Sequence, residues 1–188
     1  MKKFFYIAMA VIAFGSLSFA EQAKPATAKA HTANKKQDRD EFVLTTITGK
    51  KIKVYGTVKG LEVPAYKGKI VLLEFWGTHC PPCRESIPHY IDIMKKYGKN
   101  VAILAIEAQD TSKSALAQFV KSKGINYDVV SSSDGAYFID YVSKRTNWNG
   151  AIPFLMIFNK KGEFITQQIG MVPESAIVRI LKKLMAQK

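Results

Sequence analysis

Alternating apolar and polar residues open the folded part of the sequence. The stretches EFVLTTITG (41–49) and KKIKVYGTVKG (50–60) alternate in this way and are separated by a Gly-Lys turn. Alternation with a period of two is typical of strands that are buried on one face. The pattern therefore predicts two short strands or a hairpin at the start of the domain.

Two nearly unbroken apolar runs follow, KIVLLEFW (69–76) and NVAILAIEA (100–108). Such runs are expected of strands that are buried on both faces. The segment 81–98 between them repeats apolar residues at helical spacing and stops at Gly98, and Pro88 is expected to kink this helix. Strand, helix and strand in this order predict a parallel βαβ unit.

The rest of the sequence continues the alternation of helices and strands. It predicts an amphipathic helix over 112–124, a strand over 125–130 and a short helix with a loop over 131–150. A hairpin over 153–170 and a closing helix over 173–187 follow. We therefore predict an α/β fold with a central mixed sheet that is flanked by helices, because βαβ units supply parallel strands and the hairpin supplies antiparallel ones.

The N-terminus has the layout of a secretory signal peptide. Lys2 and Lys3 precede a 17-residue apolar run, and Ser18 and Ala20 occupy the small-residue positions of a cleavage site. We predict a signal peptide over residues 1–20. The alternative is an uncleaved membrane anchor, since the run is at the short limit for a membrane span.

Residues 21–40 contain almost no bulky apolar side chains, so we predict a disordered leader or tether there. Residues 41–188 then form a single domain with a full core. The signal peptide predicts a periplasmic or other extracytoplasmic location, tethered to the membrane if the leader is uncleaved, where disulfides persist.

The formal net charge of +13 adds little about binding partners. The basic residues are scattered along the sequence and do not form a stripe with aromatic residues. Together with export, this argues against nucleic acid as a partner. We interpret the charge as a contribution to solubility and to attraction toward a membrane surface.

The only two cysteines, Cys80 and Cys83, lie between a buried strand and a helix. A C-x-x-C motif in this α/β context indicates redox chemistry. The helix N-terminus favours an anion, so a thiolate on Cys80 would be stabilised and nucleophilic. Cys83, one turn later and less exposed, would resolve a mixed disulfide.

Three other interpretations of the pair compete with the redox one. A purely structural disulfide across so short a loop would contribute roughly 2 kcal/mol, against about 3 for a 15-residue loop. Zinc prefers four ligands, and there is no second C-x-x-C. Cys80, Cys83 and either His79 or His89 could hold Cu(I), so a copper chaperone remains an alternative. The redox interpretation needs no metal and no organic cofactor.

The segment EFWGTHCPPCRESIP (74–88) resembles the active-site region of thioredoxin-fold proteins, and most of all the exported TlpA/ResA group. The resemblance covers residues 41–188, and FVLTTITGK is similar to the extra N-terminal strands of that group. It implies a thioredoxin-like fold, thiol-disulfide reductase activity that often serves cytochrome c maturation, and protein thiol or disulfide substrates. It also implies re-reduction by a membrane-embedded thiol donor. We expect a monomer.

The resemblance assigns roles to individual residues. Glu74 matches a buried acid under the second cysteine, which would relay a proton to or from Cys83. His79 stands where an aromatic residue is common; it is either a plain surface residue or, as a cation, a modulator of Cys80. The implied substrate-binding residues are Trp76, the cis-proline pair Ile152–Pro153, and Gly170.

The residues between the cysteines bear on the direction of the reaction. Pro81 and Pro82 have no N–H, so only the N–H of Cys83 remains inside the motif to stabilise a Cys80 thiolate. A less stabilised thiolate disfavours the reduced form and makes the pair a better reductant. We therefore predict a reductase of protein disulfides, with an oxidase or isomerase of the same fold as the alternative.

Overall fold

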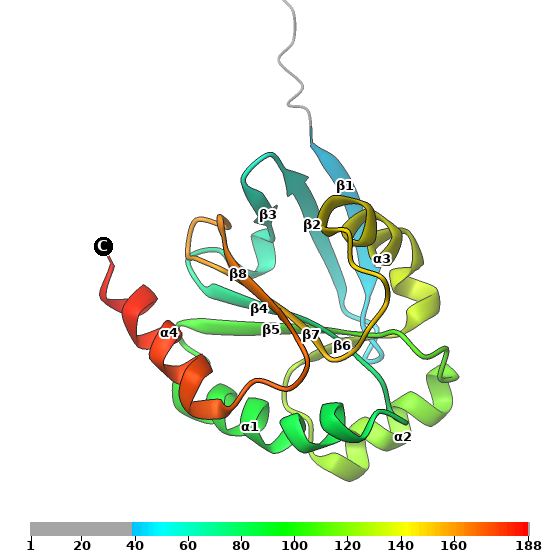
Figure 1. Cartoon of the computed structure of the whole chain (residues 1–188). Coiled ribbons are helices and arrows are strands. Elements are labelled where there is room, and N and C mark those ends of the chain that lie inside the picture. The colour runs from blue at the N-terminus through cyan, green and yellow to red at the C-terminus, as the bar shows by residue number, and fades with distance from the viewer. Residues whose placement is uncertain (1–38, 188) are drawn as a thin grey trace, which may run out of the picture. The chain divides into compact units, whose positions relative to one another are not determined.

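The computed structural model describes residues 39–187, in which a five-stranded and a three-stranded sheet are combined with four α-helices (Figure 1). The five-stranded sheet has the order β6-β5-β4-β7-β8. Its strands are β4 (Ile70–Trp76), β5 (Val101–Glu107), β6 (Asp128–Val130), β7 (Phe154–Phe158) and β8 (Phe164–Ile169). Strands β4, β5 and β6 are parallel, and β7 and β8 continue the sheet antiparallel. The predicted mixed sheet is confirmed.

The three-stranded sheet is the predicted N-terminal addition, with one strand more than the sequence indicated. Strands β1 (Asp40–Thr45), β2 (Lys51–Thr57) and β3 (Gly60–Glu62) are antiparallel in this order. A 3-10 helix, η1 (Pro64–Tyr66), connects β3 to β4. Strand β3 is three residues long, too short to produce a periodic pattern in the sequence.

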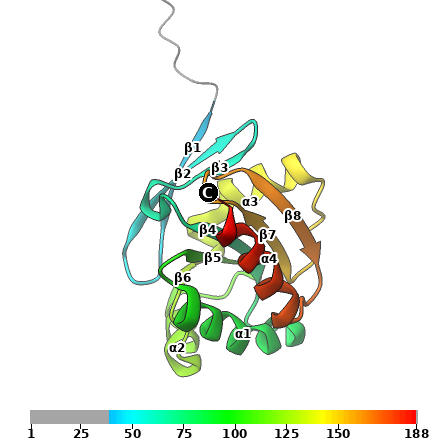
Figure 2. The same cartoon turned by 90° about the vertical axis from the view of Figure 1, so that its left-hand side faces the viewer.

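Helices cover both faces of the five-stranded sheet (Figures 1 and 2). On one face lie α1 (Pro81–Tyr97), α2 (Lys113–Lys123) and α4 (Glu174–Ala186), and on the other lie α3 (Ser132–Thr146) and the three-stranded sheet. Alternate residues of β4 point to opposite faces, so Leu72 packs toward α1 and α4 while Leu73 packs toward α3. Strand β4, which precedes the cysteines, is buried along its whole length.

Residues 131–150 form a helix and a loop as predicted, but the helix is longer than the sequence indicated. Helix α3 is a regular 15-residue helix that Ser131 caps by accepting a hydrogen bond from the backbone N–H of Asp134. Its β-branched and aromatic residues have modest helix propensity, but Phe138 and Val142 are buried against the sheet. Gly135 lets the helix approach closely, because a Cβ there would lie 2.8 Å from Ile106. Packing against the sheet therefore stabilises α3 more than its own helix propensity does.

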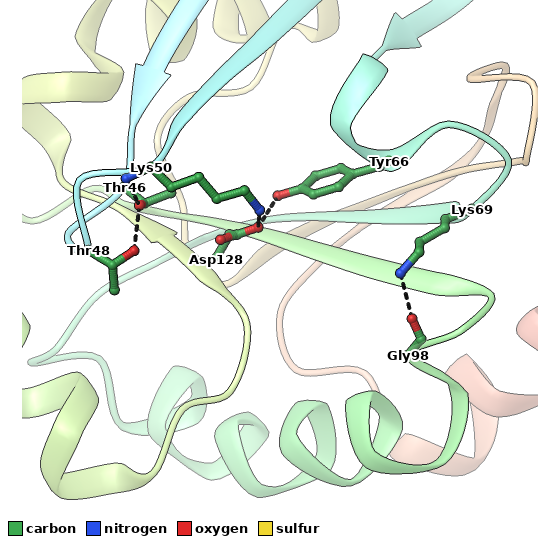
Figure 3. Close-up of polar contacts among 7 residues, drawn as sticks. All are labelled: Thr46, Thr48, Lys50, Tyr66, Lys69, Gly98 and Asp128. Atoms are coloured by element: carbon green, nitrogen blue, oxygen red, sulfur yellow. Dashed lines mark hydrogen bonds and ion pairs between the residues drawn. The ribbon is translucent and has the colours of Figure 1, made fainter.

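Polar contacts join the three-stranded sheet to the five-stranded one (Figure 3). Asp128, at the start of β6, accepts hydrogen bonds from Lys50 Nζ and from the Tyr66 hydroxyl, both at 2.7 Å. Burial raises the pKa of the Tyr66 hydroxyl, and the hydrogen bond to Asp128 raises it further. Near the end of α1, Lys69 Nζ donates to the Gly98 carbonyl at 2.6 Å. The first two contacts link the start of β6 to the N-terminal part of the domain, and the third links the start of β4 to the end of α1.

The predicted signal peptide and all but the last residues of the predicted leader lie outside the described residues. Within residues 39–187, no helix has the length and apolar character needed to cross a membrane.

Candidate active site

The cysteine pair lies at the N-terminus of α1, as predicted. Cys80 is the N-cap residue, and Pro81 and Pro82 occupy the first helical turn, where an N–H is not needed. Cys80 and Cys83 form a disulfide with Sγ atoms 2.04 Å apart and Cα atoms 5.3 Å apart. Sγ of Cys80 accepts a hydrogen bond from the Cys83 backbone N–H at 3.3 Å.

The two cysteines differ in access to solvent. Cys80 keeps 6% of its surface exposed and Cys83 keeps 1%. Cys80 is therefore the more accessible of the two cysteines to a partner's sulfur. This order of exposure is the one that an attacking and a resolving cysteine require.

Of the predicted substrate-binding residues, Trp76 and Ile152 pack with the disulfide, and Gly170 is hydrogen-bonded to Pro153. Trp76 belongs to the same apolar cluster as both cysteines, and Ile152 packs against that cluster. The Ile152–Pro153 peptide bond is cis, as the resemblance implied. Gly170, at a φ of +90°, donates its backbone N–H to the Pro153 carbonyl at 2.8 Å. These positions come from the end of β4, from the loop directly before β7 and from the residue that follows β8.

Glu74 is buried, with 2% of its surface exposed. It lies on β4 beside Ala105 of β5, and Ala105 is in the apolar cluster that contains both cysteines. Burial raises the pKa of the Glu74 carboxyl group well above its ordinary value, and hydrogen bonding by the Tyr90 hydroxyl opposes the shift. Burial and the Glu74 charge likewise raise the pKa of Tyr90 and of Tyr127. Glu74 is thus a buried acid that favours its protonated form.

His79 is exposed on the loop before Cys80. Its Nδ1 lies 3.0 Å from the Thr78 hydroxyl, and its backbone N–H donates to Gln109 Oε1 at 2.9 Å. Among the described residues, no group of three or more His, Cys, Asp or Glu side chains is placed to hold a metal ion. The structure thus adds no support to the copper-chaperone alternative.

Sequence reasoning missed a buried carboxylate beside the site. Glu107 is fully buried as the last residue of β5, and its Cα pairs with that of Trp76. It accepts hydrogen bonds from the backbone N–H groups of Gln109 and Thr111 and from the Thr111 hydroxyl. An acid at the end of an apolar strand was the available signal, but only the register between β4 and β5 shows that this acid reaches the site.

Comparison with known proteins agrees with this geometry. Residues 36–166 match the AhpC/TSA family. The chain belongs to this family. The thiol-disulfide oxidoreductase ResA of Bacillus thuringiensis (strain Al Hakam) is 32% identical over 151 residues, covering 79% of this chain and 77% of ResA. ResA of Bacillus subtilis (strain 168) is 31% identical over 141 residues, covering 74% of this chain and 70% of ResA.

A solved structure supports the fold of this AhpC/TSA member independently. The thiol:disulfide interchange protein of the thioredoxin family from Chlorobium tepidum TLS superimposes with a TM-score of 0.62 at 22% identity, covering 78% of this chain and 94% of that one. The fold is therefore thioredoxin-like. With its C-x-x-C disulfide and its ResA relatives, the protein is a thiol-disulfide oxidoreductase, and protein thiols are the substrates that its family implies.

Proposed function

We propose that the protein is an extracytoplasmic reductase of protein disulfides. The observation that carries this proposal is the hydrogen bonding of Cys80. Within the Cys80–Cys83 motif only the Cys83 N–H donates to Sγ of Cys80, because both intervening residues are prolines. Stabilisation of a Cys80 thiolate is thus limited, which weakens the reduced form and favours giving electrons away.

The proposed cycle uses both cysteines and Glu74. The Cys80 thiolate attacks a partner disulfide, so a Cys80–partner bond forms and the partner's other sulfur leaves as a thiolate. Cys83 then loses its proton and attacks Cys80 Sγ, which releases the partner's second sulfur and leaves the Cys80–Cys83 disulfide. A carboxyl group with a raised pKa, such as that of Glu74, is suited to exchange protons with a thiol.

Partner binding and re-reduction complete the proposal. The backbone next to cis-Pro153 would hold a partner chain in an extended, strand-like conformation. Resemblance to the ResA group supports re-reduction by a membrane-embedded thiol donor and a role in cytochrome c maturation. The signal-peptide pattern supports the extracytoplasmic location, and we propose that the protein acts as a monomer.

The reduction potential of the purified domain tests the direction of the reaction. Equilibration of the Cys80–Cys83 pair with thiol redox buffers should give a value of about −250 mV or lower, as in reducing members of this fold. A value near about −120 mV, typical of a strong oxidant, would replace the reductase with the oxidase alternative.

Restoring a backbone donor should raise this potential. Pro82 is the second helical residue, so Pro82→Ala adds an N–H at one of the two positions from which an N-cap side chain accepts. A hydrogen bond to a charged group contributes about 1.5–3 kcal/mol, which corresponds to roughly 30–60 mV. Pro81→Ala is the matched control, because the first helical N–H is not a capping donor. Equal shifts in both variants would contradict the donor argument.

A further inference from the structure

A line of hydrogen bonds connects the exposed His79 to the buried Glu107. His79 Nδ1 lies 3.0 Å from Thr78 Oγ1, which lies 2.8 Å from Thr111 Oγ1. The Thr111 hydroxyl in turn lies 2.8 Å from Glu107 Oε1. We call the two hydroxyl groups, Thr78 and Thr111, the threonine bridge. Thr78 is buried, with 6% of its surface exposed, so its hydroxyl has little access to water.

The direction of these hydrogen bonds follows from donor balance. The Glu107 carboxylate has only acceptors, and it receives the Thr111 hydroxyl as well as two backbone N–H groups. The Thr111 hydroxyl has a single hydrogen, which is used on Glu107, so it accepts from Thr78. The Thr78 hydroxyl has then used its own hydrogen, so it accepts from Nδ1 of His79. Nδ1 must therefore carry a proton.

The Glu107 carboxylate also positions the backbone of His79, through Gln109. Gln109 donates its N–H to Glu107 at 3.0 Å and accepts the His79 N–H on Oε1 at 2.9 Å. The Gln109 side chain packs directly against Gly77, where a Cβ would overlap it. Hydrogen bonds from the backbone of His79 and from its side chain, through Thr78, therefore connect the loop before Cys80 to the loop after β5.

We propose that Glu107, through the threonine bridge, holds the proton of neutral His79 on Nδ1. The nitrogen left to accept a proton is then Nε2, on the residue that directly precedes Cys80. The inference rests on the thiol-disulfide exchange proposed for this site. In a neutral imidazole, the hydrogen bond made by one nitrogen sets which nitrogen carries the proton. Among the hydrogen bonds of residues 39–187 none involves Nε2, and the side chain is exposed.

This arrangement suits the re-reduction of the disulfide by an incoming thiol. The thiol transfers its proton to Nε2 of His79, and the resulting thiolate attacks Cys80 Sγ. A bond forms between the incoming sulfur and Cys80, the Cys80–Cys83 bond breaks, and Cys83 leaves as a thiolate with the electron pair. The proton remains on His79 until solvent or a product thiolate takes it. Thr78, Thr111 and Glu107 are positioning residues for this step.

The tautomer of His79 can be measured directly. In oxidised protein labelled with ¹⁵N-histidine, long-range ¹H–¹⁵N correlations distinguish protonated from unprotonated ring nitrogens, and His79→Gln identifies the His79 signals. At a pH where the ring is neutral, we expect a protonated Nδ1 and a bare Nε2. A proton on Nε2 in the native protein would overturn the proposal.

Two variants break the threonine bridge, and one matched variant leaves it intact. Thr78→Val removes the acceptor for Nδ1 and should return neutral His79 to the Nε2–H form that free histidine favours in water. Thr111→Val frees the Thr78 hydroxyl to donate to Nδ1, so it should produce a mixture of the two His79 tautomers. This variant serves as the test if Thr78→Val disturbs folding. Thr48→Val removes a hydroxyl paired with Thr46 at 2.9 Å in another loop and should change nothing. An unchanged tautomer in both bridge variants would contradict the proposal.

Exchange kinetics separate this inference from the proposed function. Reduction of the disulfide by reduced glutathione at neutral pH should slow about fivefold in Thr78→Val, the size expected for the loss of one net hydrogen bond. His79→Gln should slow it at least as much, and Thr78→Val should add nothing in the His79→Gln background. Additive effects would overturn the inference and leave the oxidoreductase intact. Absence of exchange in the native protein would instead remove the proposed function.

Discussion

Replacing Cys83 by serine should convert the protein from an enzyme that turns over into a trap that holds one partner per chain. Cys80 would still attack a partner disulfide, because it is the more exposed cysteine and the N-cap of α1. The resolving sulfur would be missing, so the mixed disulfide would persist. Incubation of reduced Cys83→Ser protein with proteins of the export compartment, followed by non-reducing electrophoresis and mass spectrometry, should show adducts on Cys80.

The reciprocal variant is the matched control. Cys80→Ser keeps one sulfur, but Cys83 exposes only 1% of its surface, so this variant should neither turn over nor trap partners. Both variants lack the disulfide and carry one thiol, so a difference between them reports the position of the sulfur. Adducts of equal yield in the two variants, or none with Cys83→Ser, would contradict the assignment of Cys80 as the attacking residue.

The site could be predicted from the sequence where its signals are local. The apolar run of β4, the C-x-x-C motif and the glycine stop at Gly98 are contiguous, so the strand, the disulfide and α1 followed from one stretch of sequence. The cis peptide bond before Pro153 followed from family resemblance alone, since no local pattern distinguishes it. These are the parts in which adjacent residues, or a known motif, determine the geometry.

The parts that sequence reasoning missed depend on residues that are far apart in the sequence. The full length of helix α3 was missed because it depends on the burial of Phe138 and Val142 against the sheet, of which its own helix propensity gives little sign. Glu107 reaches the site only because β5 pairs with β4 in a register that sets it beside Trp76. The contact between Thr78 and Thr111 joins two loops that are 33 residues apart. Such contacts require the strand order, which periodicity does not provide.

Replacing Glu74 by glutamine should change how the stability of the oxidised protein depends on pH. Burial raises the pKa of this carboxyl group above its ordinary value of 4.5. As the pH rises past that value, the unfolded chain releases a proton that the folded protein retains. The free energy of unfolding therefore falls by about 1.4 kcal/mol per pH unit until the pH passes the pKa of the folded state. Glutamine cannot ionise, so the free energy of unfolding of Glu74→Gln does not fall with pH for this reason.

Urea unfolding of the oxidised proteins over a series of pH values measures this effect. The disulfide keeps both cysteines from titrating, so the difference between variant and native protein isolates Glu74. We expect that difference to shift in favour of Glu74→Gln as the pH rises above the ordinary carboxyl range. Glu85→Gln, which removes an exposed carboxyl group from α1, should leave the slope unchanged. Parallel curves for the native protein and Glu74→Gln would show that Glu74 is not a buried acid of raised pKa.

The same variant separates burial from catalysis. If Glu74 exchanges a proton with Cys83, Glu74→Gln should also slow the resolution of a mixed disulfide, by about 100-fold, at the lower end of the range for general acid–base catalysis. Stopped-flow measurement of partner release gives this rate at a fixed pH, again with Glu85→Gln as the control. A changed stability slope with an unchanged rate would leave Glu74 as a buried acid and remove it from the cycle. A slower resolution rate together with the changed pH dependence of stability would support both roles of Glu74. Burial would then destabilise its ionised form and also suit it to exchange a proton with Cys83.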